Sequence, residues 1–95
     1  VVGNIGSNGG DVNLTAIDEN IIGDIIVDSI SSLNFTMENT LFNGTINSTG
    51  NTTVVIKEGS TWNLTGDCNI TKLENHGTIN LNGFKLYVNG VEYTG

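Results

Sequence analysis

The chain has 95 residues and a net charge of −7 at pH 7, with ten carboxylates, three Lys and no Arg. This length allows one domain with a modest core. The clustered cations that bind nucleic acids or anionic membranes are missing, and no apolar run approaches the roughly 18 residues of a membrane span. The composition therefore argues against nucleic-acid binding and membrane insertion and suits a soluble, secreted surface.

The start of the chain and its cysteine content set further limits. The sequence begins Val1-Val2-Gly3 without Met and shows no signal peptide, so we expect a processed mature chain or an excised fragment. Cys68 is the only cysteine and cannot form an internal disulfide. Packing and backbone hydrogen bonds must therefore stabilise the fold.

Apolar residues stand at every second position along most of the chain. Residues 1–10 are Gly-rich and weakly patterned, and the alternation then runs through 12–14, 25–27, 33–37, 54–56, 62–64, 68–70, 79–81 and 86–88. This period predicts short β-strands, while 15 Asn, 12 Thr and 13 Gly disfavour helices. Short, closely spaced strands are typical of a sandwich, a barrel or a solenoid.

A recurring glycine corner favours the solenoid. Gly23, Gly44, Gly66 and Gly83 stand in similar short motifs and lie 21, 22 and 17 residues apart. Unequal steps of this size are typical of a parallel β-helix, whose turns absorb differences in length. We therefore predict one all-β domain over residues 1–95, a parallel β-solenoid of about four coils of 17–22 residues, with a closing segment at 89–95.

A β-sandwich is the alternative fold. Three dipeptides typical of hairpin turns support it, namely Asn43-Gly44, Asn82-Gly83 and Asn89-Gly90. In the solenoid, by contrast, equivalent residues of successive coils stack in columns. Counting from the glycines predicts two inward apolar columns, one of Leu41, Trp62 and Ile79 and one of Ile25, Ile46 and Cys68.

The side chains that could carry chemistry are few. Cys68 is expected to be a small buried hydrophobe, with an intermolecular disulfide as the alternative. His76 stands alone in a turn and makes no metal site. Asp24 and Asp28 could share a Ca²⁺ ion, but no known calcium-binding motif is present. No nucleophile motif or acid–base pair is visible, so we expect no enzyme, no catalytic residues and no cofactor, with Ca²⁺ as the open alternative.

Seven Asn-x-Ser/Thr sequons occur, at Asn13, Asn34, Asn43, Asn47, Asn51, Asn63 and Asn69. Outward Asn and Thr two residues apart on a strand produce this pattern automatically. Glycosylation of an extracellular protein is the alternative. If the chain binds a ligand, we expect outward Asn63, Thr65, Asn69 and Thr71 and their neighbours to carry the contact, and Tyr87 or Tyr93 to supply an exposed aromatic ring.

The segment Gly59-Ser60-Thr61-Trp62-Asn63-Leu64-Thr65-Gly66-Asp67-Cys68-Asn69-Ile70 resembles a coil of microbial β-helix surface proteins. These include pertactin-like autotransporter passengers and the adhesin-like or carbohydrate-binding surface proteins of anaerobic gut microbes. Residues 23–33 and 82–90 are similar to the second group. The resemblance implies a right-handed parallel β-helix outside the cell that serves adhesion, polysaccharide contact or surface-layer building. It maps no binding residue onto this chain, and Cys68 replaces the usual Ser.

Together these features predict a non-catalytic extracellular protein at the cell surface. Its role would be structural or adhesive, and its expected partners are copies of itself or neighbouring β-helix coils, joined through uncapped ends. A carbohydrate-binding module, assisted by Ca²⁺, is the alternative, with polysaccharide as the partner.

Overall fold

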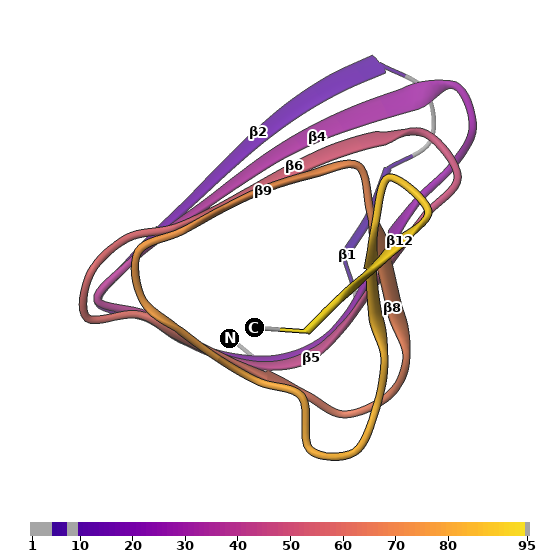
Figure 1. Cartoon of the computed structure of the whole chain (residues 1–95). Coiled ribbons are helices and arrows are strands. Elements are labelled where there is room, and N and C mark those ends of the chain that lie inside the picture. Colours follow the sequence, from indigo (N-terminus) through magenta and orange to yellow (C-terminus); the bar gives the residue numbers. More distant parts are fainter. Residues whose placement is uncertain (1–4, 8–9, 95) are drawn as a thin grey trace.

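The computed structural model describes residues 5–7 and 10–94, and all regular elements in these ranges are strands that wind into a β-solenoid of about four turns (Figure 1). The strands are β1 (Ile5–Ser7), β2 (Gly10–Ile17), β3 (Asn20–Val27), β4 (Ser31–Glu38), β5 (Leu41–Ser48), β6 (Asn51–Ile56), β7 (Thr61–Leu64), β8 (Cys68–Ile70), β9 (Lys72–Asn75), β10 (Thr78–Asn80), β11 (Leu86–Val88) and β12 (Val91–Tyr93). No helix in the described part of the chain has the length and hydropathy to cross a membrane.

Two sheets enclose the core, and their outline along the axis is triangular (Figure 1). The four-stranded sheet has the order β2-β4-β6-β9 and forms one side. The eight-stranded sheet bends around the rest of the coil, with the path β1-β3-β5-β8-β11-β12 and with β7 between β5 and β10. All pairs are parallel except β11 with β12, which excludes the β-sandwich.

The predicted coil lengths are confirmed by the register of the strands. Thr61 pairs with Thr78, a step of 17 residues, and Asn47 pairs with Asn69, a step of 22. The strands of the four-stranded sheet stay in register without slips, as in the pairing of Asn13 with Asn34. The turns therefore absorb the differences between coils.

The glycine corner is displaced from its predicted register. Gly44 lies inside β5 and pairs with Leu64 of β7, not with Gly66. From Gly44 the chain takes two residues to reach Ile46, whereas from Leu64 it takes four to reach Cys68, the residue that stacks on Ile46. Gly66 thus belongs to a two-residue insertion in the third coil, and Asn43-Gly44 is not a hairpin turn.

One residue of the predicted core is wrong. Leu41 was predicted to face inward with Trp62, but Leu41 is 36% exposed and pairs with Thr61. The inward neighbour of Trp62 is Phe42. Leu41 stands three residues before Gly44, whereas Trp62 stands four residues before Gly66, so the predicted column was one residue out of register, and such a shift reverses the face of the sheet.

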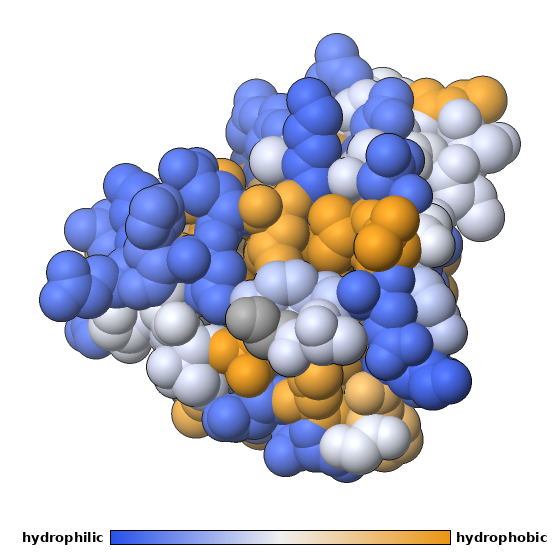
Figure 2. Space-filling model, viewed as in Figure 1, coloured by the Kyte–Doolittle hydropathy of each residue, from blue (hydrophilic) through white to orange (hydrophobic). Residues whose placement is uncertain are grey.

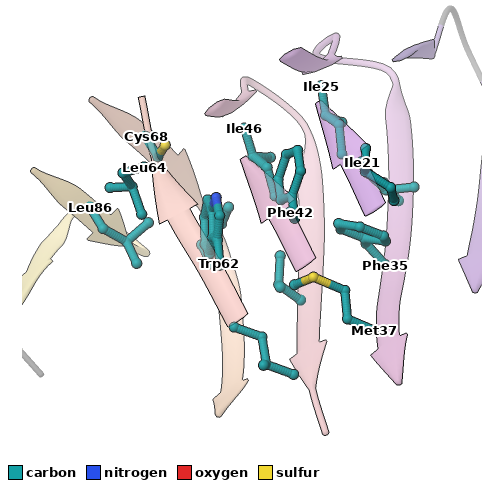
Figure 3. Packing of buried hydrophobic residues seen from close by; sticks show 14 of the residues in the cluster. Ile21, Ile25, Phe35, Met37, Phe42, Ile46, Trp62, Leu64, Cys68 and Leu86 are labelled. Atoms are coloured by element: carbon teal, nitrogen blue, oxygen red, sulfur yellow. The ribbon is translucent and has the colours of Figure 1, made fainter. Parts of the chain in front are cut away.

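The corrected column contains Ile21, Phe42 and Trp62 (Figure 3). The half-buried Ile79 pairs with Trp62 and ends the column. The Phe42 and Trp62 rings stack, with centroids 5.9 Å apart and an interplanar angle of 17°. Phe35 of the opposite sheet meets Phe42 edge-on at 5.6 Å. Aromatic contacts therefore join the two sheets across the core.

The second column is continuous through the stack. Ile25, Ile46 and Cys68 stack in register and are each no more than 1% exposed, and Leu86 extends them into the last coil (Figure 3). The number of residues between neighbours in this column differs from coil to coil, but each of these side chains faces the core.

A second corner of the coil uses the left-handed backbone conformation. Asp18 and Asn39, one coil apart, have φ values of 54° and 47°, and Gly59 beside Asn39 has 89°. Asn39 Nδ2 donates a hydrogen bond to Asp18 Oδ1 at 2.8 Å. Asp and Asn tolerate this conformation better than other side chains, so the corner forms without glycine in two of its coils.

The C-terminal strand crosses the end of the coils (Figure 1). Asn89 and Gly90 have positive φ values of 51° and 78° and turn β11 into the antiparallel β12. The half-buried Tyr93 packs against the core, and Asn75 Nδ2 of β9 donates to Tyr93 Oη at 3.2 Å. The hairpin therefore covers β11 and leaves β9 and β10 as terminal strands.

Replacing Thr52 by Val should raise the stability of the fold. Thr52 is fully buried between Leu33 and Thr71, and its Oγ1 has no hydrogen-bond partner in the described structure. A methyl group of the same shape removes the cost of burying the hydroxyl, so the free energy of unfolding should rise by about 1 kcal/mol in urea titrations. Thr53→Val, on the outer face, is the control and should change little. A loss of stability in Thr52→Val would contradict the prediction.

Candidate functional site

The outward faces of the coils carry ladders of amide side chains. Asn63 Nδ2 donates to Asn43 Oδ1 at 2.9 Å, and Asn80 Nδ2 donates to Asn63 Oδ1 at 2.6 Å. On the four-stranded sheet, Asn34 Nδ2 donates to Asn13 Oδ1 at 2.9 Å. In these ladders the amide side chains hydrogen-bond to one another, and the ladders hold neighbouring coils in register.

All seven sequon asparagines occupy exposed or half-buried outward positions. Four of them, Asn13, Asn34, Asn43 and Asn63, take part in the ladders. Asn69 Nδ2 donates instead to the Ser48 carbonyl at 3.3 Å. The register of the coils thus brings sequon asparagines together, because Asn34 of one coil hydrogen-bonds Asn13 of the coil before it, and Asn63 hydrogen-bonds Asn43 in the same way.

A polar hollow of about 460 Å³ runs along the outer face of the four-stranded sheet, near the start of its strands. Its lining comes from all four coils and is formed by Asp11, Ser32, Leu33, Asn34, Asn51, Thr53, Thr71 and Lys72. Asp11 and Lys72 are three strand steps of about 4.8 Å apart, so the hollow is about 14 Å long. It offers hydroxyls, amides, one carboxylate and one ammonium group, which suits hydrogen bonding to a polar ligand.

A second hollow, of about 430 Å³, lies at the corner that follows the four-stranded sheet. Glu38, Lys57, Glu58 and His76 line it. His76 Nε2 lies 3.1 Å from Glu74 Oε1, but both side chains are more than 60% exposed, so this pair contributes little. The lining of this hollow is therefore charged and solvated.

The carboxylates proposed for Ca²⁺ have separate partners. Asp24 accepts a hydrogen bond from Thr45 Oγ1 at 2.7 Å in mid-strand, and Asp28 accepts one from Ser31 in the next turn. Across residues 10–94, no three His, Cys, Asp or Glu side chains come together as a metal-ligand set. The structure thus gives no support to a calcium site at Asp24 and Asp28.

The aromatic residues do not form an exposed platform. Trp62 is fully buried, and its Nε1 donates to the Gly44 carbonyl at 3.1 Å. Tyr93 packs against the end of the core, and Tyr87 is half-buried and faces outward beside Asn69. The outward residues predicted to contact a ligand do not share one face. Asn63 and Asn69 lie on the eight-stranded sheet, whereas Thr71 lines the polar hollow beside the four-stranded sheet.

Of the residues that line the polar hollow, the sequence predicted only Thr71 as a contact residue and Asn34 and Asn51 as sequon positions. Asp11, Ser32 and Asn51 form one column, and Asn34, Thr53 and Lys72 lie in the next. The signal that could have found them is a step of 19 to 21 residues between these outward positions, measured along the four-stranded sheet and not from the glycines.

Cys68 should be unreactive in the folded protein. It is 1% exposed, and burial, aided by the nearby carboxylates Asp67 and Asp24, raises its pKa from 9.0 to about 11. We expect no reaction with Ellman's reagent at pH 8 without denaturant and complete reaction in denaturant, because the thiolate is the reactive form. Stability should also fall between about pH 9 and 11, where the unfolded thiol ionises before the folded one.

The matched control for this measurement is Cys68→Ser combined with Asn51→Cys, which places the thiol at an exposed strand start. It should react at once in the native state. Rapid reaction of native Cys68 would show that the third coil opens readily. The burial also means that an intermolecular disulfide through Cys68 requires prior unfolding of this coil.

Comparison of the chain with family models, with curated proteins and with solved structures found no match. The function therefore rests on the geometry of this molecule.

Proposed function

We propose that this protein is a non-catalytic structural or adhesive element of an extracellular cell surface, and that it assembles end to end into a filament or layer. The observation that carries the proposal is the open stack: β2 and β9 are the end strands of a parallel sheet whose inner strands are fully paired. Unpaired strand edges are ready templates for pairing with another chain. The acidic Asn/Thr surface and the amide ladders suit a rigid, hydrated scaffold.

The test is the assembly state of the 95-residue chain at increasing concentration. Light scattering should show growth beyond the monomer, and electron microscopy should show particles elongated in steps of one molecule. A strict monomer at high concentration would reject the end-to-end part of the proposal. Binding of the chain to whole cells or surface preparations tests the adhesive part separately.

A carbohydrate-binding module is the second candidate, and the polar hollow favours it. Its hydroxyls and amides match the hydroxyl groups of a saccharide, although no aromatic side chain lines it. A glycan array probed with and without a chelator tests this function. Binding that Asn51→Ala together with Thr53→Ala abolishes would support it; binding lost with the chelator would indicate Ca²⁺ assistance. Blank arrays in both conditions would reject the module.

A further inference from the structure

We propose that the outer edge of β2 binds an extended, cationic segment of another protein, which adds one strand to the four-stranded sheet. The segment carries aliphatic side chains at alternate positions and Lys or Arg near its ends. This inference rests on the adhesive part of the proposed function, for which it names the class of partner, and it requires no assembly of copies.

The backbone of β2 has hydrogen-bonding groups along its outer edge. Among the described residues β2 pairs with β4 alone. The amides of Gly10 and Asp18 donate to carbonyl groups of the second coil, and the register between these residues has no slip. Because the N–H groups of successive residues in a strand point to opposite sides, the odd-numbered residues from Asp11 to Ile17 direct theirs away from β4. Such an edge is a template for one more strand.

The two end strands of this sheet differ in how far their edges are protected. β9 has only four residues, and Lys72 and Glu74 are two of them. The hairpin strand β12 crosses this end of the coils, where hydrophilic residues surround the apolar middle of the face (Figure 2). Short strands and charged side chains, Lys above all, discourage pairing. β2 has eight residues, its one charged residue is Asp11 at the start, and the chain contains no Pro. The open edge is therefore that of β2.

The core face at this edge requires a partner with alternating side chains. Val12 and Leu14 stand above Leu33 and Phe35 in two core columns, but Val12 is 37% exposed and Leu14 is half-buried. Aliphatic residues at alternate positions of an added strand would cover both. A slip by one residue would place polar side chains on the core face, which disfavours that register. The outward Asn13 between them already bonds to an amide of the next coil, so amides and hydroxyls suit the other face.

The charge around β2 favours a cationic partner. Carboxylates stand at both ends of the strand, with Asp11 at its start and Asp18 and Glu19 directly after it. Residues 10–56 contain no Lys, and the chain contains no Arg. Lys or Arg near the ends of an added strand would therefore meet opposite charge, whereas β2 of a second copy would bring further carboxylates to the contact and be repelled.

A synthetic peptide tests the inference. The peptide acetyl-Lys-Val-Asn-Val-Thr-Val-Lys-amide matches β2 in either direction, with its valines on the core face and its lysines near the carboxylates. A fluorescently labelled form should bind the 95-residue chain in anisotropy titrations, and the peptide should slow hydrogen exchange at the amides of Asn13 and Thr15. Thr15→Pro removes one N–H group from the free edge and should weaken binding by about tenfold or more. Thr15→Ala keeps this N–H group and should bind like the parent.

The matched control peptide is acetyl-Lys-Val-Asn-Thr-Val-Val-Lys-amide, which has the same composition but no two valines two positions apart. Equal binding of both peptides would indicate attraction of charge alone and overturn the inference. Circular dichroism checks that Thr15→Pro folds; if it does not, the amides of the parent decide, and unchanged exchange at Asn13 and Thr15 overturns the inference. Self-association that Thr15→Pro abolishes, without peptide binding, would assign the edge to a second copy and overturn it too. Binding to whole cells without binding of the peptide would overturn the inference alone, whereas absence of both would overturn the adhesive function with it.

Discussion

Replacing Gly44 by Ala should destabilise the protein by about 3 kcal/mol or more, a large part of the stability expected for a domain of this size. A Cβ atom at Gly44 would lie 1.7 Å from the Gly23 carbonyl oxygen and 2.7 Å from Phe42 Cε1. Gly23 and Gly44 pair directly in the β3–β5 ladder, so the oxygen cannot withdraw without opening the two strands. Thermal or urea unfolding measures the effect.

Gly66→Ala is the matched control, because the sequence places Gly44 and Gly66 in the same repeated motif. At Gly66 the nearest atom to a new Cβ is Thr45 Cγ2 at 3.1 Å, the flexible end of a half-exposed side chain. We expect a change of no more than about 1 kcal/mol there. Equal losses in both variants would contradict the register in which Leu64, and not Gly66, faces Gly44.

The difference between these two glycines shows what the sequence alone could predict. The two-residue period and the recurrence at 17–22 residues suffice for the solenoid, because both follow directly from strand geometry and coil length. The column of Ile25, Ile46 and Cys68 could also be read, since each residue stands two positions after a glycine. The offset also holds in the third coil, because Gly66, although it lies in the insertion, stands two residues before Cys68.

Residues that precede the insertion could not be placed by counting from the glycines. Leu41 was chosen over Phe42 because its distance to Gly44, three residues, is nearer to the four residues between Trp62 and Gly66. The true distance is two residues, because the insertion between Leu64 and Cys68 lengthens the third coil and carries no mark in the sequence. The corner at Asp18 and Asn39 was missed for a different reason, since the left-handed conformation there uses Asp and Asn where glycine is the usual signal. The polar hollow depends on which outward residues of different coils become neighbours, and this follows only from the register of the four-stranded sheet.

Replacing Trp62 by Ala should cost about 3–5 kcal/mol, as for other large-to-small core substitutions. Trp62 is fully buried in the third coil, stacks on Phe42 and hydrogen-bonds the Gly44 carbonyl, so its loss removes contacts with the second coil as well as its own. Trp62→Phe keeps a ring but loses the hydrogen bond and some volume, and it should cost about 1–2 kcal/mol. Urea titrations followed by far-ultraviolet circular dichroism measure both, since Trp62 is the only Trp and its fluorescence is lost in the variants.

Phe84→Ala provides the control for removing an aromatic ring outside the core. Phe84 is 40% exposed in the loop between β10 and β11, so its truncation should cost about 1 kcal/mol or less. In the parent protein, Trp62 fluorescence should resist quenching by iodide until the chain unfolds, because the indole has no contact with solvent. Similar losses for Trp62→Ala and Phe84→Ala would mean that the aromatic column does not join the coils. The larger loss at Trp62 would show that the second and third coils are stabilised as one unit, because the stacked rings cross the boundary between them.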